Sequence, residues 1–275
     1  MRRHLPLCLV LALLALATAG RPAVAADQAV AFASATAVPS RVGAGSLPRA
    51  GTIIRGYLAK PRGDGPFPAV VVLHSCLGLR ADRQAVEGML ASWGYVSLLV
   101  DDFGTRGIRE TCAVDFPEGL SDAVGALAFV AGLPYVDKTR IAALGYSQGA
   151  NTALQVASLR FATSFAVPPG VSFKAVAAFY PPCENQLGVR LQLPTLILIG
   201  AADTVTPAAQ CRRLVASQPA ADVRLLVYPG AGHVFDDPAF AGGKRVLGMW
   251  LQYNGRAAAR SEAALHEFLA ASLGR

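Results

Sequence analysis

The sequence predicts an α/β fold in which a mostly parallel central sheet is covered by helices on both faces. Short apolar runs alternate with segments of helical periodicity along most of the chain, and this alternation is typical of parallel strands joined by crossover helices. The length of 275 residues suits one large domain, and 53% of the residues are hydrophobic, which excludes an intrinsically disordered chain. The sequence shows neither an internal repeat nor a linker that would divide the domain.

The first expected elements establish this pattern. Residues 52–59 alternate weakly between apolar and polar side chains, so they predict an outer strand. Residues 69–73 (AVVVL) are continuously apolar, as in a strand that is buried on both faces, and residues 95–100 (YVSLLV) predict the next buried strand. Between these two strands, residues 82–92 have the periodicity of a helix.

The alternation continues to the end of the chain. Further strands are expected at residues 140–144, 175–180, 195–199 and 223–227, and further helices at residues 118–131, 148–159, 207–217 and 261–273. Loops that follow the strands of such a sheet lie at its carboxyl edge, where functional sites of this fold class are found.

The N-terminal segment, residues 1–25, is typical of a secretory signal. Two arginines precede an apolar run over residues 5–17, and small residues at 23–25 (AVA) form a cleavage motif, with a second candidate at residues 17–19. An uncleaved membrane anchor is the alternative, but the apolar run is shorter than the roughly 20 residues that a spanning helix needs. We therefore expect an exported protein, periplasmic or secreted, without stable insertion in a membrane.

The mature chain is expected to begin with a flexible leader, residues 26–50, which is rich in Ala, Ser, Gly and Pro, followed by the folded domain, residues 51–275. Removal of the signal takes away three arginines from a chain of formal net charge +7. The remaining basic residues form neither a run nor a stripe interleaved with aromatic side chains, so a nucleic-acid partner is not expected. The cysteines and histidines lack the spacing of zinc ligands, so no metal is expected.

The sharpest motif is Gly-x-Ser-x-Gly at residues 145–149 (GYSQG), between an expected strand and an expected helix. At such a junction the motif builds a nucleophile elbow, in which the serine occupies the tip of a strained turn. Side chains two residues to either side of Ser147 would collide across the turn, and glycine removes that collision. An ordinary glycine-rich turn is the alternative, but the strand and helix around it favour Ser147 as a catalytic nucleophile.

A serine hydroxyl is a poor nucleophile without a base. His233 lies in a loop directly after the last expected strand, at the carboxyl edge of the sheet. His74 also ends a strand near the site, but it precedes Ser147 in the chain, and His266 lies on the C-terminal helix, where a surface position is expected. His233 is therefore the expected base.

The acid of such a triad lies between the serine and the histidine in chain order. Asp203 follows the apolar strand at residues 195–199 and fits this order, so it is expected to orient the imidazole of the histidine. Asp236 and Asp237 are alternatives by proximity, but they follow His233. Their other interpretation is that of carboxylates at a loop end or a helix cap.

The reaction also needs backbone N–H donors for the negative oxygen that develops on the substrate. The first is expected at Gln148, directly after the serine, and the second in the loop that follows the strand at residues 69–73. In that loop we favour the N–H of Cys76, with an ordinary loop as the alternative.

Together these stretches resemble the dienelactone hydrolase family within the α/β-hydrolase fold. The resemblance spans roughly residues 52–240 and rests on the order and spacing of VVVLHSCLGL, WGYVSLLVDDFG, VDKTRIAALGYSQG, AVAAFYP, PTLILIGAADTVTP and VRLLVYPGAGHVFDD. It implies hydrolysis of a small-molecule carboxylic ester or lactone through an acyl-enzyme, without a metal or an organic cofactor. Ser147 stands where well-known members carry cysteine, and Ser75 where they carry glutamate. The resemblance therefore does not extend to activation of a cysteine or to dienelactone as the substrate.

The resemblance also implies an arginine that holds a substrate carboxylate, supplied by the loop after the strand at residues 95–100. Arg106 lies in this loop and is suited to a bidentate contact with such a carboxylate. A structural or surface arginine is the alternative.

Four cysteines follow the signal, and an even number predicts two disulfides in an oxidising compartment, although four cysteines allow three pairings. In the expected fold Cys76 and Cys112 follow neighbouring strands, while Cys183 and Cys211 flank the next pair of strand ends. This placement favours the pairs Cys76–Cys112 and Cys183–Cys211. Free buried cysteines that act as small apolar groups are the alternative.

Three other functions fit the same fold. A peptidase usually needs a larger domain that selects its substrate, for which 275 residues hardly leave room. An acyltransferase needs an acceptor pocket that excludes water, which the sequence does not reveal. A non-catalytic binding protein is disfavoured by the intact set of serine, histidine and aspartate.

Overall fold

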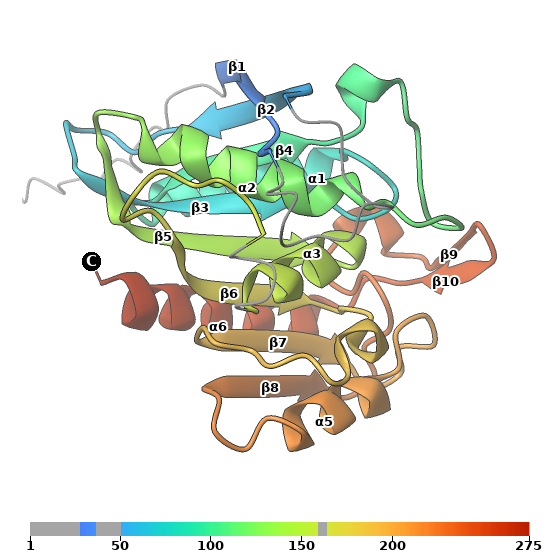
Figure 1. Ribbon diagram of the computed structural model, residues 1–275. Coiled ribbons are helices and arrows are strands. Elements are labelled where there is room, and N and C mark those ends of the chain that lie inside the picture. Colours follow the sequence, from blue (N-terminus) through green and yellow to red (C-terminus); the bar gives the residue numbers. More distant parts are fainter. Residues whose placement is uncertain (1–27, 37–50, 159–163, 275) are drawn as a thin grey trace, which may run out of the picture.

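The computed structural model describes residues 28–36, 51–158 and 164–274. Figure 1 shows a central sheet with helices packed against it, and the expected α/β-hydrolase architecture is confirmed. The expected secretory signal, residues 1–25, lies outside the described residues. Among the helices of the described segments, none has the length and apolar character needed to cross a membrane.

The sheet has eight strands in the spatial order β1-β2-β4-β3-β5-β6-β7-β8. Their bounds are β1 (Gln28–Ala33), β2 (Ile53–Ala59), β3 (Phe67–Leu73), β4 (Val96–Asp101), β5 (Val136–Tyr146), β6 (Phe173–Phe179), β7 (Thr195–Gly200) and β8 (Val223–Tyr228). The pairs from β4 to β8 are parallel, whereas β2 runs antiparallel to both β1 and β4. The carboxyl ends of six parallel strands therefore meet at one edge of the sheet.

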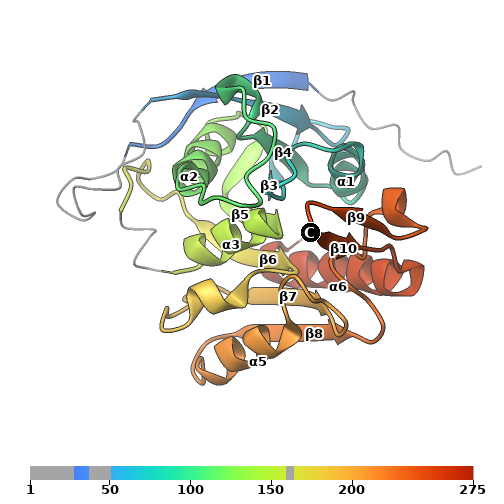
Figure 2. The ribbon, with the colours of Figure 1, turned by 90° about the vertical axis from the view of Figure 1, so that its right-hand side faces the viewer.

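Helices cover both faces of this sheet. The helices are α1 (Ala81–Ser92), α2 (Glu118–Ala131), α3 (Gln148–Val156), α5 (Ala208–Ala216) and α6 (Gly255–Leu273), and the short 3-10 turns are η1 (Gly104–Arg106), η2 (Cys183–Gln186) and η3 (Pro238–Phe240). Figure 2 shows α2 and α3 on one side of the sheet and α1 and α6 on the other. Because both faces are covered, β3 is buried from its second residue to its last, and Val70, Val71 and Val72 are fully buried.

The structure differs from the expected flexible leader over residues 26–50. Within that range, β1 pairs with β2 in an antiparallel ladder, so β1, and not the segment at residues 52–59, is the outermost strand. The pairing has a side-chain cause as well, because the buried Phe32 stacks on Phe129 with ring centroids 5.5 Å apart. The small residues around Phe32 hid this short edge strand within a composition typical of a loose segment.

A short hairpin also went unpredicted. It consists of β9 (Lys244–Val246) and β10 (Met249–Leu251), which pair in antiparallel fashion. Leu251 is fully buried and forms an isolated parallel bridge with His233. The hairpin therefore supports the backbone of the loop that carries the expected base.

Candidate active site

Ser147 occupies a strained turn between β5 and α3. Its φ of 52° and ψ of −111° lie in a region that a residue with a side chain rarely adopts. A Cβ atom at Gly145 would lie 2.2 Å from the carbonyl oxygen of Gly149. A Cβ atom at Gly149 would lie 2.4 Å from the carbonyl oxygens of Leu73 and His74 at the end of β3. The turn thus requires glycine at both positions, which is the steric reason for the Gly-x-Ser-x-Gly motif.

Ser147, His233 and Asp203 come together at the carboxyl edge of the sheet. The Ser147 Oγ atom lies 3.0 Å from His233 Nε2, and His233 Nδ1 lies 2.8 Å from Asp203 Oδ2. All three side chains are buried. A carboxylate only accepts hydrogen bonds, so Asp203 favours the tautomer with the proton on Nδ1 and leaves Nε2 free to accept a proton from the serine.

The Asp203 carboxylate is itself held in place by the turn that follows it. Its Oδ1 atom accepts hydrogen bonds from the backbone N–H groups of Val205 and Thr206, at 2.9 and 2.8 Å. The Thr206 hydroxyl lies 3.0 Å from Asp203 Oδ2 and 3.1 Å from the carbonyl oxygen of Tyr180. Thr206 is a residue of the site that no motif in the sequence indicated, although an aspartate that accepts hydrogen bonds from backbone N–H groups two and three residues later is a common turn signature.

The alternative acids lie elsewhere. Asp236 accepts a hydrogen bond from Arg83, and Asp237 forms an ion pair with Arg80 and accepts the N–H of Ala239 at the start of η3. Neither carboxylate is the partner of His233 Nδ1, which is Asp203. The helix-cap interpretation considered for these residues therefore describes Asp237.

The alternative bases are also placed away from the Ser147 hydroxyl. The Nδ1 atom of His74 lies 2.8 Å from the carbonyl oxygen of Ser75, and burial lowers the pKa of His74. His266 packs against Trp93, with ring centroids 4.5 Å apart. His233 is the histidine whose ring nitrogen meets the serine.

Thr111 links the two expected oxyanion donors. Its backbone N–H donates to the carbonyl oxygen of Cys76 at 2.9 Å, and its hydroxyl donates to the side-chain oxygen of Gln148 at 2.8 Å. Gln148 is the first residue of α3, directly after Ser147, where a helix N-terminus leaves N–H groups without partners in the helix. Thr111 thereby ties the loop after β3 to the start of α3.

Two disulfides brace the loops at this edge. Cys76 is bonded to Cys112, and Cys183 is bonded to Cys211, with Cα atoms 4.9 Å apart in each pair. The first joins the loop after β3 to the loop after β4, and the second joins η2 to α5. These are the two pairs that the order of the strands favours. Among the described residues, no cluster of histidine, cysteine, aspartate or glutamate is arranged to hold a metal ion.

Arg106 makes its bidentate contact within the protein. Its Nη1 and Nη2 atoms donate to the two carboxylate oxygens of Asp122 at 2.7 and 3.0 Å, and Nη1 also donates to the carbonyl oxygen of Asp102. Asp122 is fully buried in α2 and accepts a further hydrogen bond from Ser34. The fork that was expected to bind a substrate carboxylate is therefore engaged by Asp122.

Asp102, which lies beside the ion pair of Arg106 and Asp122, is expected to make the stability of the fold depend on pH. Burial, and after it the charge of Asp122, raise the pKa of Asp102 well above its ordinary value. In the unfolded chain the carboxyl group of Asp102 loses its proton near pH 4. Between that pH and the higher pKa of the folded protein, the native state holds a proton that the unfolded state lacks. The free energy of unfolding therefore falls as the pH rises through this range. Asp102→Asn cannot ionise, so we expect the variant to be more stable than the wild type in urea unfolding at pH 7.

The same comparison at lower pH is the control for this prediction. The difference between Asp102→Asn and the wild type should close as the pH approaches 4, because both folded and unfolded wild-type chains are then protonated at this position. A variant that is less stable than the wild type at pH 7 would contradict a neutral Asp102.

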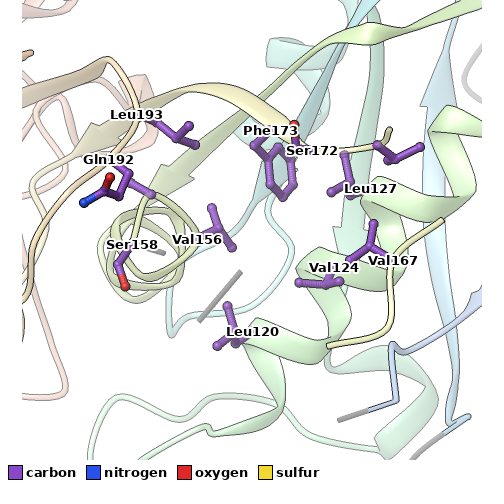
Figure 3. A pocket seen from close by; sticks show the side chains of 12 residues that line it. Leu120, Val124, Leu127, Val156, Ser158, Val167, Ser172, Phe173, Gln192 and Leu193 are labelled. Carbon is purple, nitrogen blue, oxygen red and sulfur yellow. The ribbon is translucent and has the colours of Figure 1, made fainter. Parts of the chain in front are cut away.

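A separate apolar cavity of about 190 Å³ lies between α2, the end of α3 and the chain near residue 170 (Figure 3). Its lining includes Leu120, Leu127, Val156 and Phe173, but none of the three residues Ser147, Asp203 and His233. Val156 is the last residue of α3, whereas Ser147 precedes the first. The cavity therefore belongs to the opposite end of the helix from the serine.

Comparison with known proteins finds related sequences and structures. The family model described as the dienelactone hydrolase family matches residues 54–273. A protein of Methylorubrum extorquens that carries the name "Putative carboxymethylenebutenolidase" is 27% identical over 235 residues, which are 75% of this chain and 79% of that protein.

Two solved structures share the fold. The dienelactone hydrolase from Anabaena variabilis aligns with a TM-score of 0.58 at 19% identity, covering 90% of this chain and 99% of that one. A dienelactone hydrolase-like promiscuous phosphotriesterase from metagenomic libraries aligns with a TM-score of 0.62 at 21% identity, covering 90% of this chain and 99% of that one.

Proposed function

Because the chain belongs to the dienelactone hydrolase family and is a carboxylic ester hydrolase, we propose that it works through an acyl-enzyme formed on Ser147. The observation that carries this proposal is the continuous hydrogen-bonded series from the Ser147 hydroxyl through His233 to Asp203. In that series the base is already within proton-transfer distance of the nucleophile. The tautomer favoured by Asp203 gives Nε2 the free lone pair that the step needs.

The proposed reaction has two stages. His233 takes the hydroxyl proton while Ser147 Oγ attacks the ester carbonyl carbon, and the same proton then passes to the departing alcohol oxygen. In the second stage His233 takes a proton from water as the water oxygen attacks the acyl carbon, and the proton returns to Ser147 as the carboxylic acid leaves. Asp203 orients the imidazole and stabilises its charged form in both stages.

The N–H groups of Gln148 and Cys76 are the proposed donors to the oxyanion. The N-terminus of α3 supports the first, because the helix dipole favours negative charge there. The disulfide to Cys112 and the Thr111 hydrogen bond support the second, because they restrict the loop that carries it.

The substrate class proposed is a small carboxylic ester or lactone. The name of the Methylorubrum extorquens relative, a butenolidase, supports the inclusion of lactones. The engagement of Arg106 by Asp122 gives no support for a requirement that the substrate be acidic. We therefore expect neutral short-chain and aryl esters to be accepted.

We also propose that the protein is exported with residues 1–25 removed. The signal-like N-terminal sequence supports this, as do two disulfides, which persist in oxidising compartments. N-terminal sequencing of the protein recovered from the cell exterior or periplasm tests it, and a chain that still begins at Met1 there would overturn the cleavage.

Labelling by a fluorophosphonate probe tests the nucleophile. The wild type should react stoichiometrically, and Ser147→Ala should not react, because the probe phosphorylates an activated serine hydroxyl. Ser158→Ala is a matched control, since Ser158 is a buried serine that lies at the distant cavity and should leave labelling intact. Equal labelling of the wild type and Ser147→Ala would remove Ser147 from the mechanism. Separately, the rates at which the wild type hydrolyses a panel of short-chain, aryl and lactone esters would define the substrate.

A further inference from the structure

Tyr180 contacts the imidazole of His233 and also the residues that flank the base, Thr206 and Asp236. It follows β6 directly, is buried, and has a positive φ of 40°, which is unusual for a bulky residue. Its ring packs edge-to-face against the His233 imidazole with centroids 4.7 Å apart, and its carbonyl oxygen lies 3.1 Å from the Thr206 hydroxyl beside Asp203. A strained backbone at a bulky residue is retained when the surrounding structure fixes it, and such positions cluster at functional sites.

The Tyr180 hydroxyl is bonded to the loop that carries His233. It donates to Asp236 Oδ1 at 2.8 Å, and Asp236 is only three residues after His233. The other oxygen of the same carboxylate accepts a hydrogen bond from Arg83 Nη2 at 2.9 Å. One carboxylate therefore joins the end of β6, the histidine loop and helix α1.

Arg83 completes the connection to the nucleophile. Its guanidinium carbon lies 3.6 Å from the ring centroid of Tyr146, the residue that precedes Ser147, and its side chain is 5% exposed. Asp82 is its second ionic partner. Tyr146, next to the serine, and Asp236, in the loop of the histidine, thus both contact the buried side chain of Arg83.

Tyr180 and Arg83 keep a fixed protonation state. Burial lowers the pKa of Arg83, but Asp236 and the other neighbouring groups raise it well above its ordinary value. Burial, and after it the charge of Asp236, raise the pKa of Tyr180 well above its ordinary value. The phenol therefore remains a donor and the guanidinium remains charged throughout the pH range in which an ester hydrolase works.

We propose that Tyr180, Asp236 and Arg83 are positioning residues that hold the His233 imidazole in line with the Ser147 hydroxyl; this inference rests on the function proposed above. Asp203 and the Thr206 hydroxyl both lie at Nδ1 of the ring, so the orientation of the Nε2 edge toward the Ser147 hydroxyl depends on packing around the ring. Packing of the Tyr180 ring restricts this orientation, and the Tyr180–Asp236 bond fixes the loop on which the histidine stands. A displacement of about 1 Å at such a site is enough to reduce turnover strongly.

The test measures turnover per active serine in Tyr180→Phe and Asp236→Asn. Tyr180→Phe keeps the ring and removes one hydroxyl, so we expect kcat per fluorophosphonate-titrated site to fall about tenfold, the equivalent of one lost hydrogen bond. KM should stay within twofold, because none of these groups is proposed to touch the substrate. Asp236→Asn leaves one acceptor oxygen where Tyr180 and Arg83 now bind two, so its effect should be at least as large. The effects of the two changes should be less than additive in the double variant, because both weaken the same connection.

Tyr228→Phe is the matched control. Tyr228 packs on Phe235, as Tyr180 does, but its buried hydroxyl has no hydrogen-bond partner among the described residues. Its kcat per titrated site should equal that of the wild type. Titration of active sites separates the proposal from a merely structural role, which would lower the number of reactive sites or the melting temperature without changing turnover at each site.

The outcomes are distinct. If Tyr180→Phe turns over like the wild type per titrated site, the positioning proposal is overturned while the proposed function stands. If Asp236→Asn does not fold, Tyr180→Phe alone decides the question, because it removes a single oxygen atom from the core. A wild type that neither labels nor hydrolyses esters would instead overturn the function itself.

Discussion

Replacing Asp203 by asparagine is expected to lower kcat by about 10⁴-fold, while the folded structure remains. Asp203 Oδ2 lies 2.8 Å from His233 Nδ1 and accepts a hydrogen bond from the N–H group there. An asparagine amide can present its NH₂ group to the same nitrogen, which would favour the tautomer with the proton on Nε2. That proton would face the Ser147 hydroxyl and prevent His233 from acting as a base.

The measurement is steady-state hydrolysis of an aryl ester, with circular dichroism to verify folding. Asp237→Asn is the control, because Asp237 is a neighbouring aspartate that binds Arg80 and caps η3 instead of contacting the imidazole. We expect its kcat to remain within a few-fold of the wild type. A kcat for Asp203→Asn within tenfold of the wild type would show that another group orients His233.

Gly149→Ala is expected to destabilise the protein by more than about 4 kcal/mol, or to prevent folding altogether. The added Cβ atom would lie 2.4 Å from two carbonyl oxygens, those of Leu73 and His74. Both belong to backbone at the end of the buried strand β3, so neither can move aside as a flexible side chain does. Helix propensity favours alanine over glycine by about 1 kcal/mol, which is too little to offset such an overlap.

Gly88→Ala separates this steric effect from the general preference for alanine in helices. Gly88 lies in α1, and a Cβ atom there would meet no other atom within 4 Å. This control is expected to be neutral or to stabilise the protein by up to about 1 kcal/mol. Urea unfolding of both variants gives the comparison, and equal stabilities would disprove the close packing of α3 on β3.

Local signals in the sequence were sufficient for most of the fold. Continuously apolar segments such as residues 69–73 and 195–199 identified β3 and β7, because strands buried on both faces need apolar side chains throughout. β1 was missed because four of its six residues are alanine or glutamine, and only Val30 and Phe32 are larger apolar residues that pack against the core. An edge strand of this kind is defined by its pairing with β2, which is a tertiary property.

In the site too, residues set by a local motif could be predicted from the sequence, whereas residues that meet only in the folded chain could not. Ser147 was recognisable because its motif and the steric need for glycine lie within five residues. Arg83, Tyr180 and Asp236 are far apart in the chain, and nothing in their immediate sequence indicates that they meet. For Arg106 the family resemblance suggested a substrate contact, but Asp122, sixteen residues later, is its partner in the folded chain.

The two disulfides divide the chain into closed rings. The Cys76–Cys112 bond encloses α1 and β4, and therefore Arg83, while the Cys183–Cys211 bond encloses β7 and the loop after it, which carries Asp203. Cleavage of the backbone once within either ring would leave the two fragments covalently joined. A nick in the exposed segment after η1 would thus leave the fragment that contains α1 and β4 attached, through the Cys76–Cys112 bond, to the fragment that carries the serine, the aspartate and the histidine.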